Sequence, residues 1–117
     1  MDSETLDDLL AECRTFCGIT WNDDQADKQL TSFIKSSDSR LKSIYGGDLS
    51  YDVEDEENPD VNALARDLLI HRVFYMREKG LDDFEDNFRA ELNTLYRKGQ
   101  VAQYLKKQKE TESDSGA

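Results

Sequence analysis

Proline, glycine and basic residues are scarce in this chain, and each shortage narrows what the protein can be. One proline and six glycines among 117 residues leave few positions at which a helix has to end, which favours long helices. The 15 lysines and arginines are outnumbered by 26 aspartates and glutamates, so the net charge is −11 at pH 7. A field of this sign repels DNA and anionic membranes at long range, which argues against a sequence-specific DNA-binding protein.

Long apolar runs and cysteines are also scarce. No apolar run approaches the roughly 20 residues that a membrane-spanning helix needs, and the acidic opening MDSETLDD is unlike a signal peptide. The two cysteines, Cys13 and Cys17, lie four positions apart on a predicted helix. That spacing suits neither a disulfide nor a CxxC metal motif, so we expect a reducing compartment and no membrane partner.

Candidate reactive residues are few. His71 is the only histidine, and nothing around it supplies the nucleophile that a catalytic triad needs, so we interpret it as a structural or surface residue. Together with Cys13 and Cys17 it would offer a metal only three ligands, without a short-spacing motif. The acidic run from Asp52 to Glu57 lacks the glycine and glutamate of an EF-hand, whether counted from Asp48 or from Asp52. The residues themselves therefore give little support to a catalytic or metal site.

The chain does carry amphipathic helical periodicity, in four segments. These segments are Thr5–Cys17, Asp24–Tyr45, Pro59–Lys79 and Asp83–Lys98. We predict an all-α fold: one four-helix domain over residues 1–105, in which the two long central helices pack against each other as the core pair. Residues 106–117, KKQKETESDSGA, lack apolar side chains and are predicted to form a disordered polar tail.

An acidic connector, residues 48–58, joins the two long predicted helices. Leu49, Tyr51 and Val53 alternate with polar residues, a pattern that leaves a short strand or hairpin arm open beside a solvated loop. The four consecutive acids from Glu54 to Glu57 form a charge run too dense to fold alone.

Two stretches, ITWNDDQADKQL and DDFEDNFRAELNTL, resemble in order and spacing the head–tail connector (head-completion adaptor) proteins of long-tailed phages and prophages, the Gram-positive branch above all. The matching residues are Ile19, Trp21, Asp23, Asp24, Asp27, Leu30, Ile34, Tyr75, Arg77, Phe84, Asn87, Phe88, Glu91 and Leu92. The resemblance covers Thr5 to Val101. The chain departs from the family in its Tyr45-Gly46-Gly47 break, its extended acidic loop and a missing aromatic near the end of the third helix.

The resemblance implies a structural virion protein without catalysis or cofactor. Such proteins assemble in the bacterial host cytoplasm as a ring, commonly of twelve copies, under the portal protein in the virion neck. The ring extends the channel for non-specific passage of genomic DNA and supports tail attachment through a downstream neck or tail-completion protein. The candidate subunit-interface or lumen residues are Trp21, Glu54, Asp55, Glu56, Glu57, Arg72 and Arg77.

Two questions stay open at the level of sequence. Trp21 either anchors a subunit interface, where tryptophan is enriched, or covers the end of the first two helices. For the whole chain, the alternative to a connector is a small acidic regulatory or DNA-mimic protein that binds a basic protein partner. An enzyme comes third, since the carboxylates are spread along the chain without a sign of a pocket.

Overall fold

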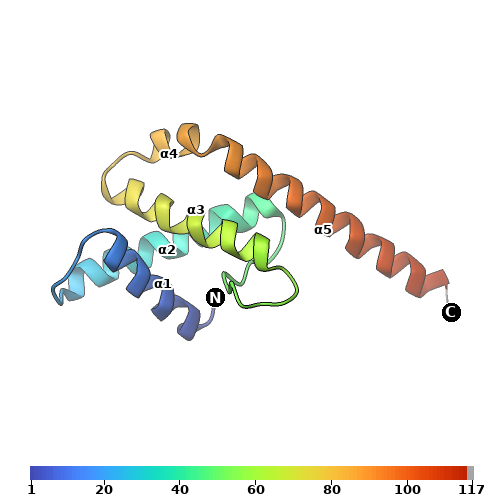
Figure 1. Ribbon diagram of the computed structural model, residues 1–117, viewed down its shortest axis with the longest axis horizontal. Coiled ribbons are helices and arrows are strands. Elements are labelled where there is room, and N and C mark those ends of the chain that lie inside the picture. Colours follow the sequence, from blue (N-terminus) through green and yellow to red (C-terminus); the bar gives the residue numbers. More distant parts are fainter. Residues whose placement is uncertain (116–117) are drawn as a thin grey trace.

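A computed structural model of the protein describes residues 1–115. This part of the chain contains helices and no strand (Figure 1). The helices are α1 (Ser3–Phe16), α2 (Asp24–Tyr45), α3 (Pro59–Arg77), α4 (Leu81–Asn87) and α5 (Arg89–Ser115). The predicted all-α class is therefore confirmed, whereas the count of four helices is corrected to five over the described residues.

The extra helix arises because the predicted fourth segment is broken at Phe88. This residue leaves helical geometry, with φ −109° and ψ 20°, and its amide caps α4 by donating to the carbonyl of Phe84. Its ring stacks on that of Phe84 at a centroid distance of 5.0 Å, and both rings lie near Tyr75 of α3. The break lets α4 and α5 each pack on α3.

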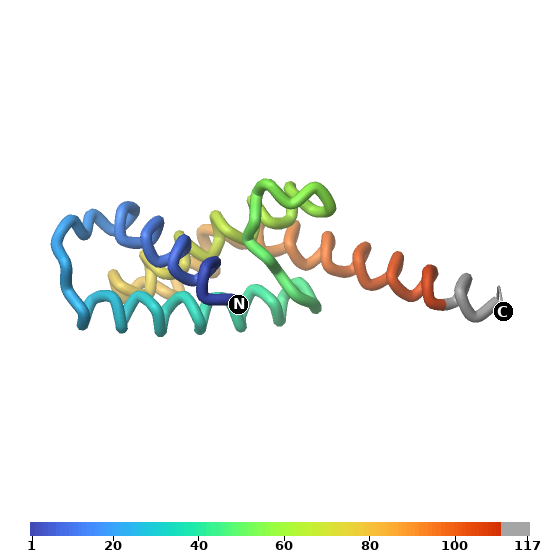
Figure 2. Tube along the Cα trace, turned by 90° about the horizontal axis from the view of Figure 1, so that it is seen from below, coloured from blue at the N-terminus to red at the C-terminus, as the bar shows by residue number. Residues whose placement is uncertain are grey.

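The central pair of the fold is α2 and α3, as predicted, with α1 packed against both (Figures 1 and 2). Asp23 starts α2 by accepting the amides of Gln25 at 2.9 Å and Ala26 at 3.3 Å, and Gly46 ends it in the left-handed region at φ 83°. The core between these helices is made of fully buried aliphatic side chains. They include Leu30, Ile34, Leu41, Ala65, Leu68, Leu69 and Val73.

The acidic connector is folded onto the core and contains no strand, so the expected hairpin arm is absent from it. Leu49 and Tyr51 are buried, and the Tyr51 hydroxyl donates to Asp38 Oδ1 of α2 at 2.5 Å. Burial, followed by this hydrogen bond to a carboxylate, raises the pKa of Tyr51 far above its ordinary value. The tyrosine therefore holds the base of the loop, and the acids beyond it are left near the surface.

The last helix is much longer than predicted. Residues 106–115, which we expected to be disordered, continue α5, and only residues 116–117 of the predicted tail lie outside the described part. The physical reason is that lysine, glutamine and glutamate are good helix formers, so a helix already nucleated on the core can propagate through them. As a result α5 projects well beyond the other helices (Figure 2).

Candidate interaction surfaces

Arg72 lies inside the subunit, which removes it from the predicted interface or lumen residues. It is only 7% exposed, and its Nη1 donates to Ser37 Oγ of α2 at 3.0 Å and contacts Met76 Sδ at 3.2 Å. Its Nε has no hydrogen-bond partner within the described part of the chain. Burial lowers the pKa of this guanidinium, because a charge is costly in a poorly solvated place. Arg72 therefore acts in packing between α2 and α3.

Arg77, the second predicted arginine, is half-buried at the end of α3. It lies close enough to Cys17 of the α1 terminus to act on its thiol. Burial raises the pKa of Cys17, and the positive charge of Arg77 opposes that rise. Arg77 thus stands at the junction of α1 and α3, partly accessible to a neighbouring molecule.

Trp21 lies in the loop between α1 and α2 and is 53% exposed. Its backbone is held in place, because the Trp21 carbonyl accepts from Arg14 Nη2 at 2.6 Å while Arg14 Nη1 pairs with Asp27 at 2.5 Å. An indole that is half in solvent on an anchored loop shields little of the helix end. The geometry therefore favours the interface interpretation of this residue over the covering one.

The acidic run keeps three of its four members in solvent. Glu54, Glu56 and Glu57 are exposed, whereas Asp55 is half-buried. Asp55 accepts the amide of Glu57 at 3.0 Å and the side-chain amide of Asn62 at 3.4 Å, so it organises the loop. The three glutamates are consequently left exposed along an ordered loop.

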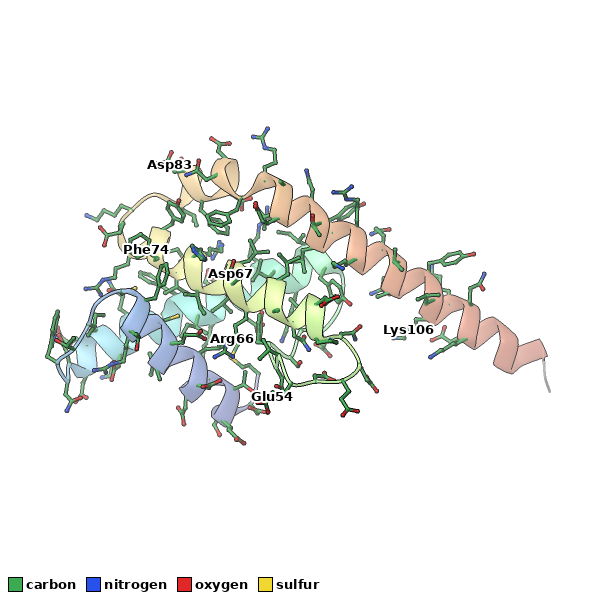
Figure 3. The ribbon with its side chains drawn as sticks, viewed as in Figure 1. Glu54, Arg66, Asp67, Phe74, Asp83 and Lys106 are labelled. Carbon is green, nitrogen blue, oxygen red and sulfur yellow. The ribbon has the colours of Figure 1, made fainter. Side chains whose placement is uncertain are left out.

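An acidic groove of about 800 Å³ lies between α1 and this loop. Its charged lining consists of Asp2, Glu4, Asp8, Glu12, Asp52, Glu54 and a single base, Arg66. Figure 3 shows Arg66 on α3 beside α1 and the loop that carries Glu54. Arg66 binds Asp8 at 3.0 Å and Glu12 at 2.5 Å. Burial alone lowers the pKa of Arg66, but the hydrogen bonds to these two carboxylates outweigh it and raise the value.

A second concave surface, which we call the α5 groove, has a volume of about 470 Å³. It is lined by Tyr45, Asn58, Val61, Thr94, Arg97, Lys98, Val101, Ala102 and Leu105. Val101 is 58% exposed and Leu105 is 54% exposed, although both are apolar. The sequence analysis missed this surface. The i, i+4 spacing of Val101 and Leu105 was its one visible signal.

The potentially reactive side chains are held in packed surroundings. Burial raises the pKa of Cys13 to about 12, so its thiol stays protonated. The His71 ring packs between Phe16 and Phe88, and its Nδ1 lies 2.8 Å from the Asp67 carbonyl. Among the side chains that the structure describes, those of residues 1–110, no group of three or more histidines, cysteines or carboxylates is arranged to hold a metal. Nor does any described helix combine the length and apolar content needed to cross a bilayer.

Comparison with known proteins adds no relative: neither a protein-family model, nor a curated protein, nor a solved structure matches this chain. The connector-like motifs and the three surfaces therefore carry the functional argument. Those surfaces are the Trp21 loop, the acidic groove and the α5 groove.

Proposed function

We propose that this protein is a structural subunit of a phage neck, a head–tail connector that forms a ring under the portal and extends the DNA channel. The observation that carries the proposal is the uncovered apolar surface of α5. Val101, Tyr104 and Leu105 are each more than half exposed on a helix that projects beyond the body. Apolar surface gains free energy when it is removed from water, so this helix favours contact with another molecule.

The charge distribution supports a role as a channel wall. Glu54, Glu56 and Glu57 are exposed, and the whole chain has a net charge of −11. A conduit has to let DNA slide without holding it, and carboxylates repel phosphates rather than bind them. In this proposal the acidic loop faces the lumen or an adjacent copy, and the partners are further copies, the portal protein and a downstream neck or tail-completion protein.

The proposal is tested on virions. We expect phage particles made without this chain in the bacterial host to lose their packaged DNA or to fail to acquire tails. In electron micrographs the purified protein should add a ring to the phage portal protein. Infectious, tailed particles formed in its absence would end the connector proposal.

The role of the acidic loop has its own experiment. A variant with Glu54→Gln, Glu56→Gln and Glu57→Gln keeps the side-chain shapes and leaves the hydrogen bonds of Asp55 in place, but removes three exposed negative charges. We expect it to assemble less well or to retain DNA less well. A control with Asp7→Asn, Asp82→Asn and Glu91→Gln removes the same charge from exposed helical sites. Equal behaviour of the two variants and the wild type would refute the role of the loop.

The acidic groove favours a second candidate, a small protein that binds a basic partner as a DNA mimic does. Its six carboxylates against one arginine suit a lysine- or arginine-rich segment. A mimic should remain a monomer and should displace DNA from a basic protein. A connector should instead associate with the portal and leave such complexes intact.

A further inference from the structure

The α5 groove combines an apolar floor with a basic rim. Arg97 and Lys98 stand among its lining residues, and none of those residues is acidic. The net charge of the chain is −11, so a surface with basic and no acidic residues differs from most of the molecule. Its chemistry therefore suits an occupant that has a large apolar tip flanked by carboxylates.

Pairing of two α5 helices with each other does not meet this requirement. An antiparallel pair centred on Gln103 would bury Val101 and Leu105 of both copies. The same register would set Arg97 of one copy against Lys109 of the other. Like charges brought together at an interface are unfavourable, so an acidic surface from another part of a second copy suits the groove better than a second α5 in this register.

The loop between α1 and α2 carries a large apolar side chain next to carboxylates, which is the combination that the α5 groove suits. Trp21 is the only tryptophan of the chain and is 53% exposed. Asp23 and Asp24 follow directly, and Asp24 is exposed at the start of α2. This loop lies at the opposite end of the molecule from the projecting part of α5 (Figures 1 and 2).

We propose that Trp21 of one copy inserts into the α5 groove of a second copy, with Asp24 beside Arg97 and Lys98. The two surfaces differ and lie apart along the long axis of the subunit, so the contact is head-to-tail. Repeated head-to-tail contacts close into a ring or continue as a filament. The inference rests on the proposed function and deepens it, since it names the surfaces through which neighbouring subunits meet.

The single tryptophan allows a direct test with two complementary variants. Val101→Asp spoils the groove and keeps Trp21, whereas Trp21→Ala keeps the groove and removes the fluorophore. We expect each variant alone to remain a monomer. On mixing, Trp21 of the first should enter the groove of the second, so its emission should shift to shorter wavelength and saturate, and sedimentation should show a dimer and nothing larger.

Two controls isolate the contact. Gln100→Asp introduces the same charge at an exposed site on α5 that does not line the groove, so it should self-associate like the wild type. A double variant, Trp21→Ala with Val101→Asp, should leave the emission of the Val101→Asp protein unchanged. The inference is overturned if the mixture shows no shift up to about 1 mM, the range of the weakest specific contacts. It is equally overturned if Trp21→Ala self-associates like the wild type.

The outcomes also separate this contact from the connector role. Rings of Trp21→Ala subunits on the portal, as regular as wild-type rings, would keep the connector role and overturn the contact. Saturable mixing of the two variants, together with normal virions made without the protein, would keep the contact and overturn the connector role.

Discussion

The crossing of α5 over the end of α2 depends on Gly99, and replacing this residue by alanine tests the packing directly. A Cβ built on Gly99 would lie 1.8 Å from the Tyr45 carbonyl oxygen and 2.7 Å from its carbonyl carbon. Side-chain Cβ atoms essentially never approach another heavy atom more closely than 3.0 Å. The obstacle is backbone, so rotation of a side chain cannot relieve it, and α5 has to move away by more than an ångström.

Two effects of Gly99→Ala oppose each other. Alanine in a helix interior is favoured over glycine by about 1 kcal/mol. Overpacking of a filled interface costs about 1–3 kcal/mol, and a gap of about 1 Å forfeits up to half of the dispersion energy of the atoms that it separates. The buried side chains Tyr45, Leu92 and Leu95 lie in this region, so we expect a net destabilisation of about 2 kcal/mol.

Thermal unfolding followed by far-ultraviolet circular dichroism measures the effect. For a domain of this size, about 2 kcal/mol lowers Tm by roughly 8 °C. The exposed neighbour Gln100→Ala is the matched control, and it should change stability by less than about 0.5 kcal/mol. A Gly99→Ala protein that is more stable than the wild type would show only the helix-propensity gain, and it would refute the close crossing.

Three further predictions concern the core. Leu68→Asp should abolish cooperative unfolding, because it buries an unpaired charge at a fully buried position, whereas Ala63→Asp on the exposed face of α3 should remain folded. Arg72→Met should leave stability unchanged or raise it by about 1 kcal/mol in urea unfolding, since it removes a buried guanidinium with an unpaired Nε; a large loss of stability would contradict this. The pKa of Cys13 is raised from 9.0 to about 12 in the folded state, so its contribution to stability is complete below pH 9 and is lost as the pH rises towards 12. Cys13→Ala should flatten that decline in unfolding free energies measured across this pH range, and an unchanged slope would show that the thiol is not responsible.

The parts of the fold that follow from local chemistry could be predicted from the sequence. The spacing of apolar residues predicts the three helices before residue 80, α1, α2 and α3. The pairing of α2 with α3 follows from the width of their apolar faces. The break at Phe88 could not be predicted in this way, because a single helical face accommodates Phe84, Phe88 and Leu92 equally well. It is set by the packing of the two phenylalanine rings on Tyr75, which a one-dimensional pattern does not contain.

The candidate surfaces were harder to predict for the same reason. The acidic groove depends on Arg66 meeting Asp8 and Glu12, which are more than 50 positions away in the sequence. Arg72 looked like a surface residue as long as its partner Ser37 was unknown. Trp21 stands out in the sequence because it belongs to no amphipathic pattern, but the sequence left open whether it is an interface anchor or a cover over the first two helices.

The fold and the proposed contact meet at one residue. The carbonyl oxygen of Tyr45 lies too close to position 99 for any residue with a Cβ atom, and the Tyr45 side of the fold also lines the α5 groove. Gln103, one turn further along α5, donates to the carbonyl of Gly46 and fixes the same crossing. A helix pushed away at Gly99 would therefore also widen the groove beside it. Gly99→Ala should accordingly weaken the uptake of Trp21 from a second copy even at temperatures where the variant is fully folded, whereas Gln100→Ala should not. Equal uptake by both variants would mean that the groove forms independently of this crossing.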